Sequence, residues 1–269
     1  MNSQIFGVEY ITSKANSTVV KISKLMQKKA RREEQLFTLD GVKLFVEAHN
    51  FGAKIKYIVL KDDAIFEENI TKMIFEEKKK GASVLCVNEA VFSKLTEEFS
   101  PQGIITVCEF LDTGSDFCFK NDEKIMAFES VRDPGNVGAI IRNAAAFGIN
   151  TLIFSSDCAD VYSQKVIRAA MGAIFKVKMY IVNDFIGTLK ALSKNRRIIS
   201  TTLGENSLKL GTSSINPDDV FVIGNEGHGV SEEVIGLSHE TLFIPMCENT
   251  ESLNASVATA ILMWEMYKL

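Results

Sequence analysis

The chain has 269 residues, enough for two domains of ordinary size, and 46% of them are hydrophobic, which excludes a disordered polypeptide. It carries 30 basic and 34 acidic side chains, a formal net charge of −4, so a role in nucleic-acid binding must rest on local charge. The five cysteines form no C-x-x-C pair, which argues against a disulfide framework or a zinc site.

The sequence also lacks the patterns of a membrane protein. No apolar run approaches the roughly 18–20 residues that a membrane-spanning helix needs. The first residues do not have the charged-then-apolar pattern of a secretion signal. We therefore expect a cytoplasmic protein that enters no membrane and binds no metal.

The first distinctive segment is basic. Residues 14–32 contain seven basic side chains and no acidic ones, and apolar residues recur among them at helical spacing. This pattern predicts an amphipathic helix with a cationic face. Most such runs are only solvated, but the one-sided charge makes contact with RNA an equal alternative. The residues expected to contact RNA are Lys14, Lys28, Lys29, Arg31 and Arg32.

Strands and helices alternate in the rest of the first part of the chain. Strands are predicted at 36–39, 55–60, 83–87 and 103–110, and helices at 41–50, 65–80 and 89–96. The alternation predicts a small α/β domain over residues 1–111. Residues 112–123 are rich in Gly, Ser, Asp, Asn and Lys and are predicted to be a linker.

Residues 124–269 alternate again. Strands are predicted at 125–128, 151–154, 176–180, 197–202, 220–223 and 241–244, and helices at 137–147, 163–171, 184–193, 231–237 and 253–267. This order predicts a mostly parallel sheet with helices on both faces. In such sheets ligands bind beyond the carboxyl ends of the strands.

The first of three unusual loops covers residues 129–138. It leaves a predicted strand and opens a helix, whose free N–H groups suit an anion. Within that helix Arg142 stands among apolar residues. An arginine on a buried helix needs a partner or a ligand, which favours a functional Arg142 over a surface salt bridge.

Two further loops follow later strands. The loop 224–229 has three glycines and places Glu226 just past a strand end, but it matches neither dinucleotide-binding nor P-loop motifs. His228 is expected to stabilise this loop. The loop 244–258 leads into the final helix, where Ser252 could be the N-cap and would leave Asn254 in the first turn.

Taken together, these loops resemble the motifs of a known family. N-x-G-x-x-x-R from Asn136 to Arg142, G-x-E from Gly224 to Glu226, and I-P-M…S-L-N from Ile244 to Asn254 resemble the three motifs of the SpoU (TrmH-like) RNA 2′-O-ribose methyltransferases of the SPOUT class. The resemblance covers about residues 124–269, and the N-terminal part looks like the family's RNA-substrate-binding domain. It implies a C-terminal SPOUT-type α/β domain with a trefoil knot, S-adenosylmethionine as cofactor, and a homodimer.

The resemblance also implies which residues form the site. The candidate catalytic residues are Asn136, Arg142, Glu226, Ser252 and Asn254. The candidate cofactor-binding residues are Thr202, Gly204, Gly224, Glu226, Ile244, Met246 and Leu253. This chain has Glu248 where the family usually has glycine. If the loop needs a backbone position with positive φ, a neighbouring residue that adopts this conformation more readily, such as Asn249, would have to provide it.

The expected activity is therefore 2′-O-methylation of RNA, with ribosomal RNA of the 23S type favoured over transfer RNA. Because a guanidinium has a pKa above about 12, Arg142 is expected to bind the substrate phosphate and stabilise an alkoxide rather than act as a base. One alternative is an RNA-binding protein with a decayed catalytic domain. Another is a nucleotide-binding oxidoreductase or kinase-like enzyme, which the lack of either phosphate-loop motif disfavours.

Overall fold

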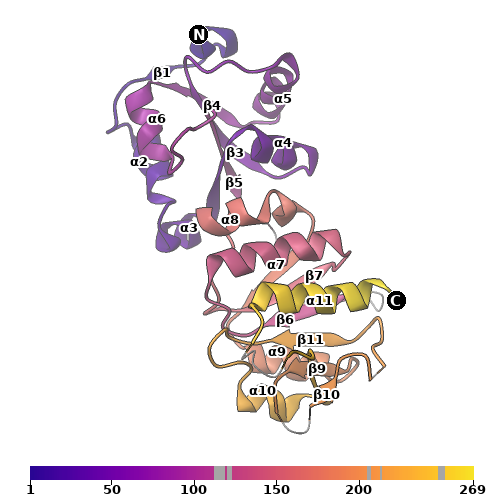
Figure 1. Cartoon of the computed structure of the whole chain (residues 1–269). Coiled ribbons are helices and arrows are strands. Elements are labelled where there is room, and N and C mark those ends of the chain that lie inside the picture. The colour runs from indigo at the N-terminus through magenta and orange to yellow at the C-terminus, as the bar shows by residue number, and fades with distance from the viewer. Residues whose placement is uncertain (112–118, 120–122, 205–206, 213, 248–251) are drawn as a thin grey trace. The chain divides into compact units, whose positions relative to one another are not determined.

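The computed structural model of the chain describes residues 1–111, 119, 123–204, 207–212, 214–247 and 252–269 (Figure 1). Contacts divide the chain into two compact units, one of residues 1–111 with 162–167 and the other of residues 112–161 with 168–269. Each unit has its own sheet and its own core. None of the helices in the described part of the chain has the length and apolar character needed to cross a bilayer.

The first unit is built on a five-stranded mixed sheet in the order β1-β4-β3-β5-β2. Helices cover both faces, with α2 and α6 on one side and α4 and α5 on the other (Figure 1). The strands are β1 (Tyr10–Ile11), β2 (Leu36–Asp40), β3 (Ile55–Lys61), β4 (Ser83–Val87) and β5 (Ile104–Glu109). The helices are α1 (Asn2–Phe6), α2 (Ser17–Lys24), α3 (Lys28–Glu34), α4 (Val42–Asn50), α5 (Glu68–Lys79) and α6 (Glu89–Leu95).

The basic segment forms two helices, so the prediction of one continuous helix is wrong. The helix α2 ends at Lys24 and α3 begins at Lys28. Arg31 is only 4% exposed, and its Nη1 donates to the carbonyl oxygens of Leu25 at 2.7 Å and Met26 at 2.8 Å. These carbonyls follow the end of α2, where the helix leaves such groups without a partner. The guanidinium of Arg31 therefore caps the break, and the expectation that it contacts RNA is corrected.

A segment from later in the chain completes the first unit. The ring of Tyr162 stacks on that of Phe110 with 3.9 Å between the centroids. Two residues further on, Gln164 Nε2 donates to the carbonyl oxygen of Thr38 at 3.0 Å. The first unit is therefore not one continuous stretch of sequence.

The second unit contains a seven-stranded sheet in the order β10-β12-β9-β11-β6-β7-β8, in which every neighbouring pair of described strands is parallel. The strands are β6 (Ile125–Phe128), β7 (Thr151–Ser155), β8 (Lys178–Val182), β9 (Ile198–Thr201), β10 (Leu208–Lys209), β11 (Val220–Ile223) and β12 (Glu240–Phe243). The helices are α7 (Pro134–Ala146), η1 (Ala173–Phe175), α9 (Phe185–Leu192), α10 (Glu232–Leu237) and α11 (Ala255–Tyr267). A further helix, α8 (Gln164–Ala170), begins in the segment assigned to the first unit and ends in the second.

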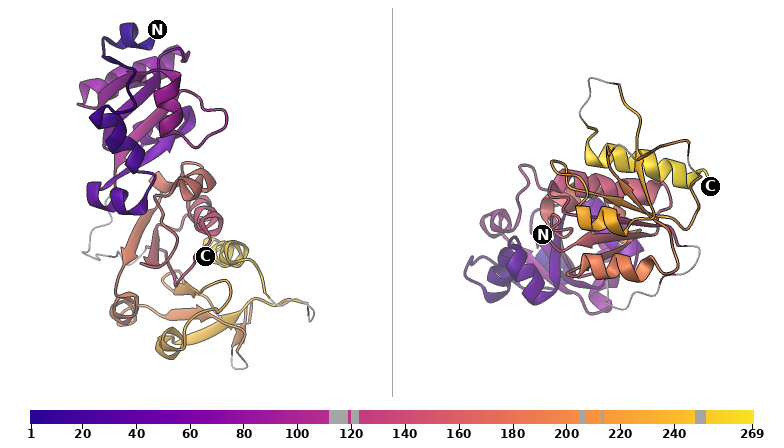
Figure 2. Two further views of the ribbon diagram at one scale, coloured as in Figure 1. Left: turned by 90° about the vertical axis from the view of Figure 1, so that its left-hand side faces the viewer. Right: turned by 90° about the horizontal axis from the view of Figure 1, so that it is seen from below.

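Two helix pairs cover this second sheet. The helices α7 and α11 pack together on one face, and α9 and α10 pack together on the other (Figure 2). Both units are thus layered arrangements of helices on a sheet, and the predicted α/β class is confirmed. The trefoil knot stays a prediction.

The parallel order of the second sheet brings four loops to one edge. The strands β12, β9, β11 and β6 are consecutive neighbours and run in the same direction. Their carboxyl ends therefore open side by side, which is the edge where ligands bind in sheets of this kind. All three motif-bearing loops of the sequence start from this edge.

Candidate functional site

The start of α7 holds Asn136 in place. Asp133 is the N-cap, and its Oδ1 accepts the amide hydrogen of Asn136 at 2.8 Å. Pro134 occupies the first helical position, where its missing N–H costs nothing and its fixed φ suits the helix. This capped first turn comes at the end of the loop that follows β6 and buries Asn136.

Asn136 joins the other two motif loops through both ends of its amide. Its Nδ2 donates to Glu226 Oε1 at 2.9 Å, and its Oδ1 accepts from Asn254 Nδ2 at 2.8 Å. An amide has two hydrogens and two lone pairs, so Asn136 keeps one of each for a ligand. The structure thus brings together three of the five candidate catalytic residues.

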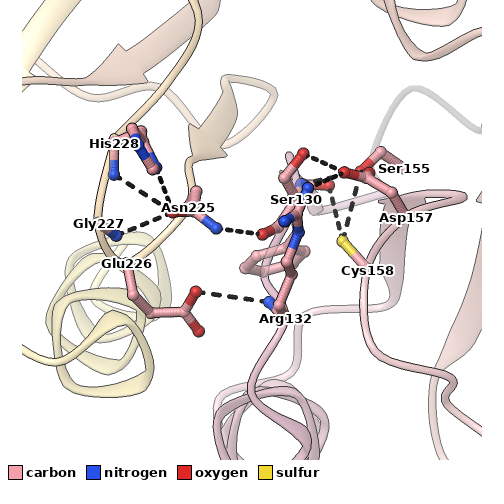
Figure 3. A network of polar contacts seen from close by, with 10 residues as sticks. Ser130, Arg132, Ser155, Asp157, Cys158, Asn225, Glu226, Gly227 and His228 are labelled. Carbon is pink, nitrogen blue, oxygen red and sulfur yellow. Dashed lines mark hydrogen bonds and ion pairs between the residues drawn. The ribbon is translucent and has the colours of Figure 1, made fainter.

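Glu226 is held from two sides. Besides the Asn136 amide, the backbone N–H of Arg132 lies 3.4 Å from Glu226 Oε2 (Figure 3). The backbone N–H of Asp133 lies 3.4 Å from Glu226 Oε1. Partial burial raises the pKa of Glu226, but these hydrogen bonds outweigh it and the pKa is lowered overall. The side chain is therefore an ionised acceptor near neutral pH and a weak base, which suits it to positioning Asn136.

Asn254 begins the final helix. Its Oδ1 accepts from the amides of Ser256 at 2.9 Å and Val257 at 3.3 Å, which makes it the N-cap of α11. The expectation that Ser252 caps this helix is therefore wrong, because the helix starts two residues later. Ser252 is exposed and has no hydrogen-bond partner among the described residues. Glu248 and Asn249, named above for backbone strain, lie outside the described residues.

Arg142 is exposed, which corrects the argument from burial. The helix α7 buries Val137, Ile140 and Ile141 against the sheet, whereas Arg142 points away from that face. It lies six residues beyond Asn136, about 9 Å further along the helix axis. No side chain in the described part of the chain pairs with it, so its guanidinium is open to a ligand.

The glycine-rich loop after β11 closes tightly on itself. A Cβ on Gly224 would lie 2.1 Å from the carbonyl carbon and oxygen of Gly229. Asn225 and Gly229 exchange two backbone hydrogen bonds of 2.9 Å. Close packing within the loop therefore accounts for glycine at 224, whatever the loop binds.

Asn225, which the sequence reasoning did not single out, ties this loop to the one after β6. Its Oδ1 accepts from the amides of Gly227 at 2.9 Å and His228 at 3.2 Å, while its Nδ2 donates to the carbonyl oxygen of Ser130 at 2.8 Å (Figure 3). An asparagine within a glycine-rich turn is the signal that could have identified it. The predicted loop-stabilising role belongs more to Asn225 than to His228.

Ser130 continues this network to the loop after β7. It has a φ of 55°, and its hydroxyl donates to Asp157 Oδ2 at 2.5 Å. Ser155 Oγ donates to Asp157 Oδ1 at 2.6 Å and accepts from the Ser130 amide at 2.8 Å. Burial raises the pKa of Asp157, but the hydrogen bonds from Ser130, Ser155 and Arg132 outweigh it and lower the pKa overall. An ionised Asp157 thus anchors the backbone of Ser130.

The candidate cofactor-binding residues lie on neighbouring loops. Thr202 and Gly204 follow β9, and Ile244 and Met246 follow β12, which is paired with β9. The Thr202 amide donates to the Leu242 carbonyl at 3.1 Å. Their common edge of the sheet makes joint binding of one ligand possible, and the role of each residue in holding a cofactor stays a prediction.

Four of the five candidate RNA-binding residues are exposed on the first unit. They are Lys14, Lys28, Lys29 and Arg32. Lys29 makes a loose ion pair with Glu33 at 3.8 Å, in which both side chains are largely exposed. Within the described residues, no three His, Cys, Asp or Glu side chains gather as a metal site would require.

Two sequence families match the chain. The sequence model of the SpoU rRNA Methylase family matches residues 123–264, and that of the MRM3-like substrate binding domain matches residues 16–106. A relative from Bacillus subtilis, the 23S rRNA guanosine 2′-O-methyltransferase RlmP, is 28% identical over 261 residues. That alignment covers 96% of this chain and 99% of the relative.

Solved structures match over nearly the whole chain. An AdoMet-bound rRNA methyltransferase from Sinorhizobium meliloti is 30% identical with a TM-score of 0.85, and 97% of each chain is covered. The SpoU methyltransferase AviRb from Streptomyces viridochromogenes, in complex with AdoMet, is 22% identical with a TM-score of 0.82, over 94% of this chain and 97% of that one. At that identity the AviRb match shows the fold alone.

The close approach at Gly224 gives a stability prediction. We expect Gly224→Ala to lower the free energy of unfolding by about 1–3 kcal/mol, because the new methyl group overlaps the Gly229 backbone. Gly227→Ala is the matched control, since a Cβ there meets only Asn225 Oδ1 at 3.5 Å. Scanning calorimetry of both variants makes the comparison. Equal unfolding midpoints for the two variants would contradict the packing described here.

Proposed function

The chain belongs to the SpoU rRNA methylase family, and on that premise we propose that it transfers a methyl group from S-adenosylmethionine to a ribose 2′-hydroxyl of ribosomal RNA. The observation that carries the proposal is the hydrogen-bonded Glu226–Asn136–Asn254 cluster. Support for an rRNA of the 23S type over transfer RNA comes from the B. subtilis relative and from the N-terminal match to a substrate binding domain. The cytoplasmic location stays a prediction.

S-adenosylmethionine, when bound, supplies an electrophilic methyl group. The residues that would hold it are Thr202, Gly204, Gly224, Ile244, Met246 and Leu253. Their chemistry fits, because backbone groups at strand ends and half-buried apolar side chains are what an adenosine needs. A Cβ on Gly204 would make only ordinary van der Waals contacts, the nearest with Ser207 Oγ at 3.6 Å, so packing does not require glycine at this position. The AdoMet-bound S. meliloti relative supports S-adenosylmethionine as the cofactor.

In this proposal the protein's own residues orient the ribose and stabilise charge. Asn136 and Asn254 use their remaining hydrogen-bonding capacity to orient the ribose, and Ser252 assists them. Glu226 fixes the direction of the Asn136 amide. The exposed guanidinium of Arg142 binds the substrate phosphate and stabilises the alkoxide that develops as the hydroxyl releases its proton to solvent water. Holding the reacting groups in line can supply several kcal/mol of the rate enhancement.

The role of Arg142 leads to the first functional prediction. We expect Arg142→Ala to lower kcat for methyl transfer to rRNA by about 100-fold or more, as loss of an oxyanion donor does in other enzymes. The Kd for S-adenosylmethionine, measured by calorimetry, should stay unchanged because Arg142 is not in the cofactor loops. Arg142→Lys keeps the charge but not the planar fork and should recover only part of the rate. Near-normal turnover in the alanine variant would rule out this role.

The basic residues of the first unit lead to the second functional prediction. Replacing Lys28, Lys29 and Arg32 with alanine should weaken RNA binding. The slope of the logarithm of the binding constant against the logarithm of the salt concentration should become shallower by about 0.7–0.9 for each phosphate that is no longer neutralised. Arg31 is left intact because it caps α2. The matched control removes the same number of charges at the exposed Lys43, Lys54 and Lys72 of the same unit. If both triple variants lose affinity equally, the basic run has no special role.

We also propose that a second copy of the chain covers α11, as the homodimer expected from the sequence requires. Trp264 and Tyr267 are 47% and 55% exposed, and Val257 lies two turns before Trp264 on the same side of the helix. The Trp264 and Tyr267 rings stack on each other and meet Phe147, the C-cap of α7. Such a cluster of exposed aromatic side chains is typical of an interface.

Light scattering tests the dimer directly. At micromolar concentration we expect a mass of about twice 29.8 kDa for the parent protein. Trp264→Glu should shift the mass towards that of one chain, because a carboxylate would be buried at the interface. A parent mass near 29.8 kDa would contradict the proposal.

A further inference from the structure

A second concave site lies beside the reaction centre. A cavity of about 390 Å³ opens between the loop after β6 and the loop after β11. The residues that line it are Glu129, Ser130, Arg132, Asn225, His228, Gly229 and Ser231, and their carbon atoms contribute most of the exposed lining. None of these residues is a candidate for cofactor binding. The volume is at the lower end of the roughly 300–1,000 Å³ of small-molecule sites and suits a single nucleotide unit.

Glu226 connects this cavity to the reaction centre. It accepts from the Arg132 amide on one carboxylate oxygen and from Asn136 on the other. Along the chain it directly follows Asn225 and lies two residues before His228 (Figure 3). Both of these neighbours line the cavity. A nucleotide whose ribose meets Asn136 therefore has this cavity next to it.

Most of the lining groups already have partners within the protein. The two carboxylate oxygens of Glu129 accept from the amide of Ser231 at 2.8 Å and from its hydroxyl at 2.7 Å. Asn225 and Ser130 are engaged in the network described above. The groups with capacity left for a ligand are therefore on Arg132 and His228.

Arg132 has donors to spare. Its side chain is 70% exposed, and its ion pair, between Nη2 and Asp157 Oδ2, measures 3.4 Å. A guanidinium carries five N–H donors in a planar fork, so most of them are free to bind a ligand edge that presents two acceptors.

His228 offers an acceptor on the same cavity. Asn225 Nδ2 donates to Ser130, so the atom of Asn225 that faces His228 is the acceptor Oδ1, 3.2 Å from His228 Nδ1. The hydrogen of a neutral imidazole is therefore on Nδ1, and Nε2 is left as an acceptor. The cavity thus combines a donor fork with a single acceptor.

We propose that this cavity is the subsite for the base of the nucleotide to be methylated, and that Arg132 and His228 select guanine there. The inference rests on the proposed function and names its substrate. Guanine presents two adjacent acceptors, O6 and N7, which arginine binds with both arms of its fork, and its N1–H and N2 amino groups can donate to His228 Nε2. Adenine presents N7 beside a donor and repels one arm of the fork. A base read in this way must be unstacked, as is usual in sequence-specific RNA recognition.

The first test uses mononucleotides and needs no RNA substrate. GMP, AMP, CMP, UMP and inorganic phosphate are titrated into the full-length protein, and NMR follows the side-chain N–H signals of Arg132 and His228. We expect GMP to shift both signals and to bind at least fivefold more tightly than AMP, CMP or UMP. Arg132→Lys should lose this preference, and Lys54→Ala, which removes an exposed cation outside every proposed site, should keep it. Equal shifts with all five probes would mean that the site contacts phosphate rather than a base. An absence of shifts would mean that the cavity binds no nucleotide. Either result overturns the proposal.

The second test separates this inference from the proposed function. The parent protein is incubated with an unmodified 23S rRNA transcript, and the modified nucleosides are identified by mass spectrometry. We expect 2′-O-methylguanosine, and a rate at least about tenfold lower for Arg132→Ala with the cofactor Kd unchanged. Ribose methylation of a different base overturns the guanine subsite and leaves the proposed function standing. If no RNA is methylated, the proposed function fails, and the mononucleotide titration still decides on the subsite.

Discussion

The candidate site depends on one side-chain amide that is hydrogen-bonded at both ends. Asn136 connects an acceptor, Glu226, to a donor, Asn254, and so joins the loops that follow β6, β11 and β12. Only a group with a donor and an acceptor at fixed ends can make this link. An aspartate would place a second carboxylate against Glu226, and an alanine would leave both partners unpaired. The lowered pKa of Glu226 is part of the same constraint, because its acceptor role requires the ionised form.

A second network gives this cluster a rigid base. Asp157 accepts from the hydroxyl of Ser130, and the Ser130 carbonyl oxygen accepts from Asn225 Nδ2. The Oδ1 of Asn225 accepts from the Gly227 amide and so fixes the turn that carries Glu226. The loops after β7, β6 and β11 are thus joined in the order of their strands in the sheet. Because Glu226 belongs to both networks, the reaction centre and the cavity beside it cannot move independently. This coupling is why a base bound by Arg132 and His228 would have a defined ribose position.

The core strands and the motif loops could be predicted from the sequence, but several contacts could not. Val220–Ile223 is an apolar run of the kind that is buried on both faces of a parallel sheet, and its position predicted where Glu226 lies. The family match confirms the resemblance that named the motif residues. The strands Tyr10–Ile11 and Leu208–Lys209 are too short to carry a periodic pattern. The burial of Arg31 depends on a helix break that no proline or glycine marks, and the exposure of Arg142 depends on which face of α7 meets the sheet.

The central claim is that the Asn136 cluster serves methyl transfer to a ribose oxygen. Its most direct test is to supply S-adenosylmethionine with a deuterated methyl group together with ribosomal RNA, digest the product to nucleosides, and locate the label by tandem mass spectrometry. The account predicts the labelled methyl on the ribose fragment in the parent protein and its loss in Asn136→Ala. A label on a base fragment, or equal ribose labelling in the variant, would contradict it.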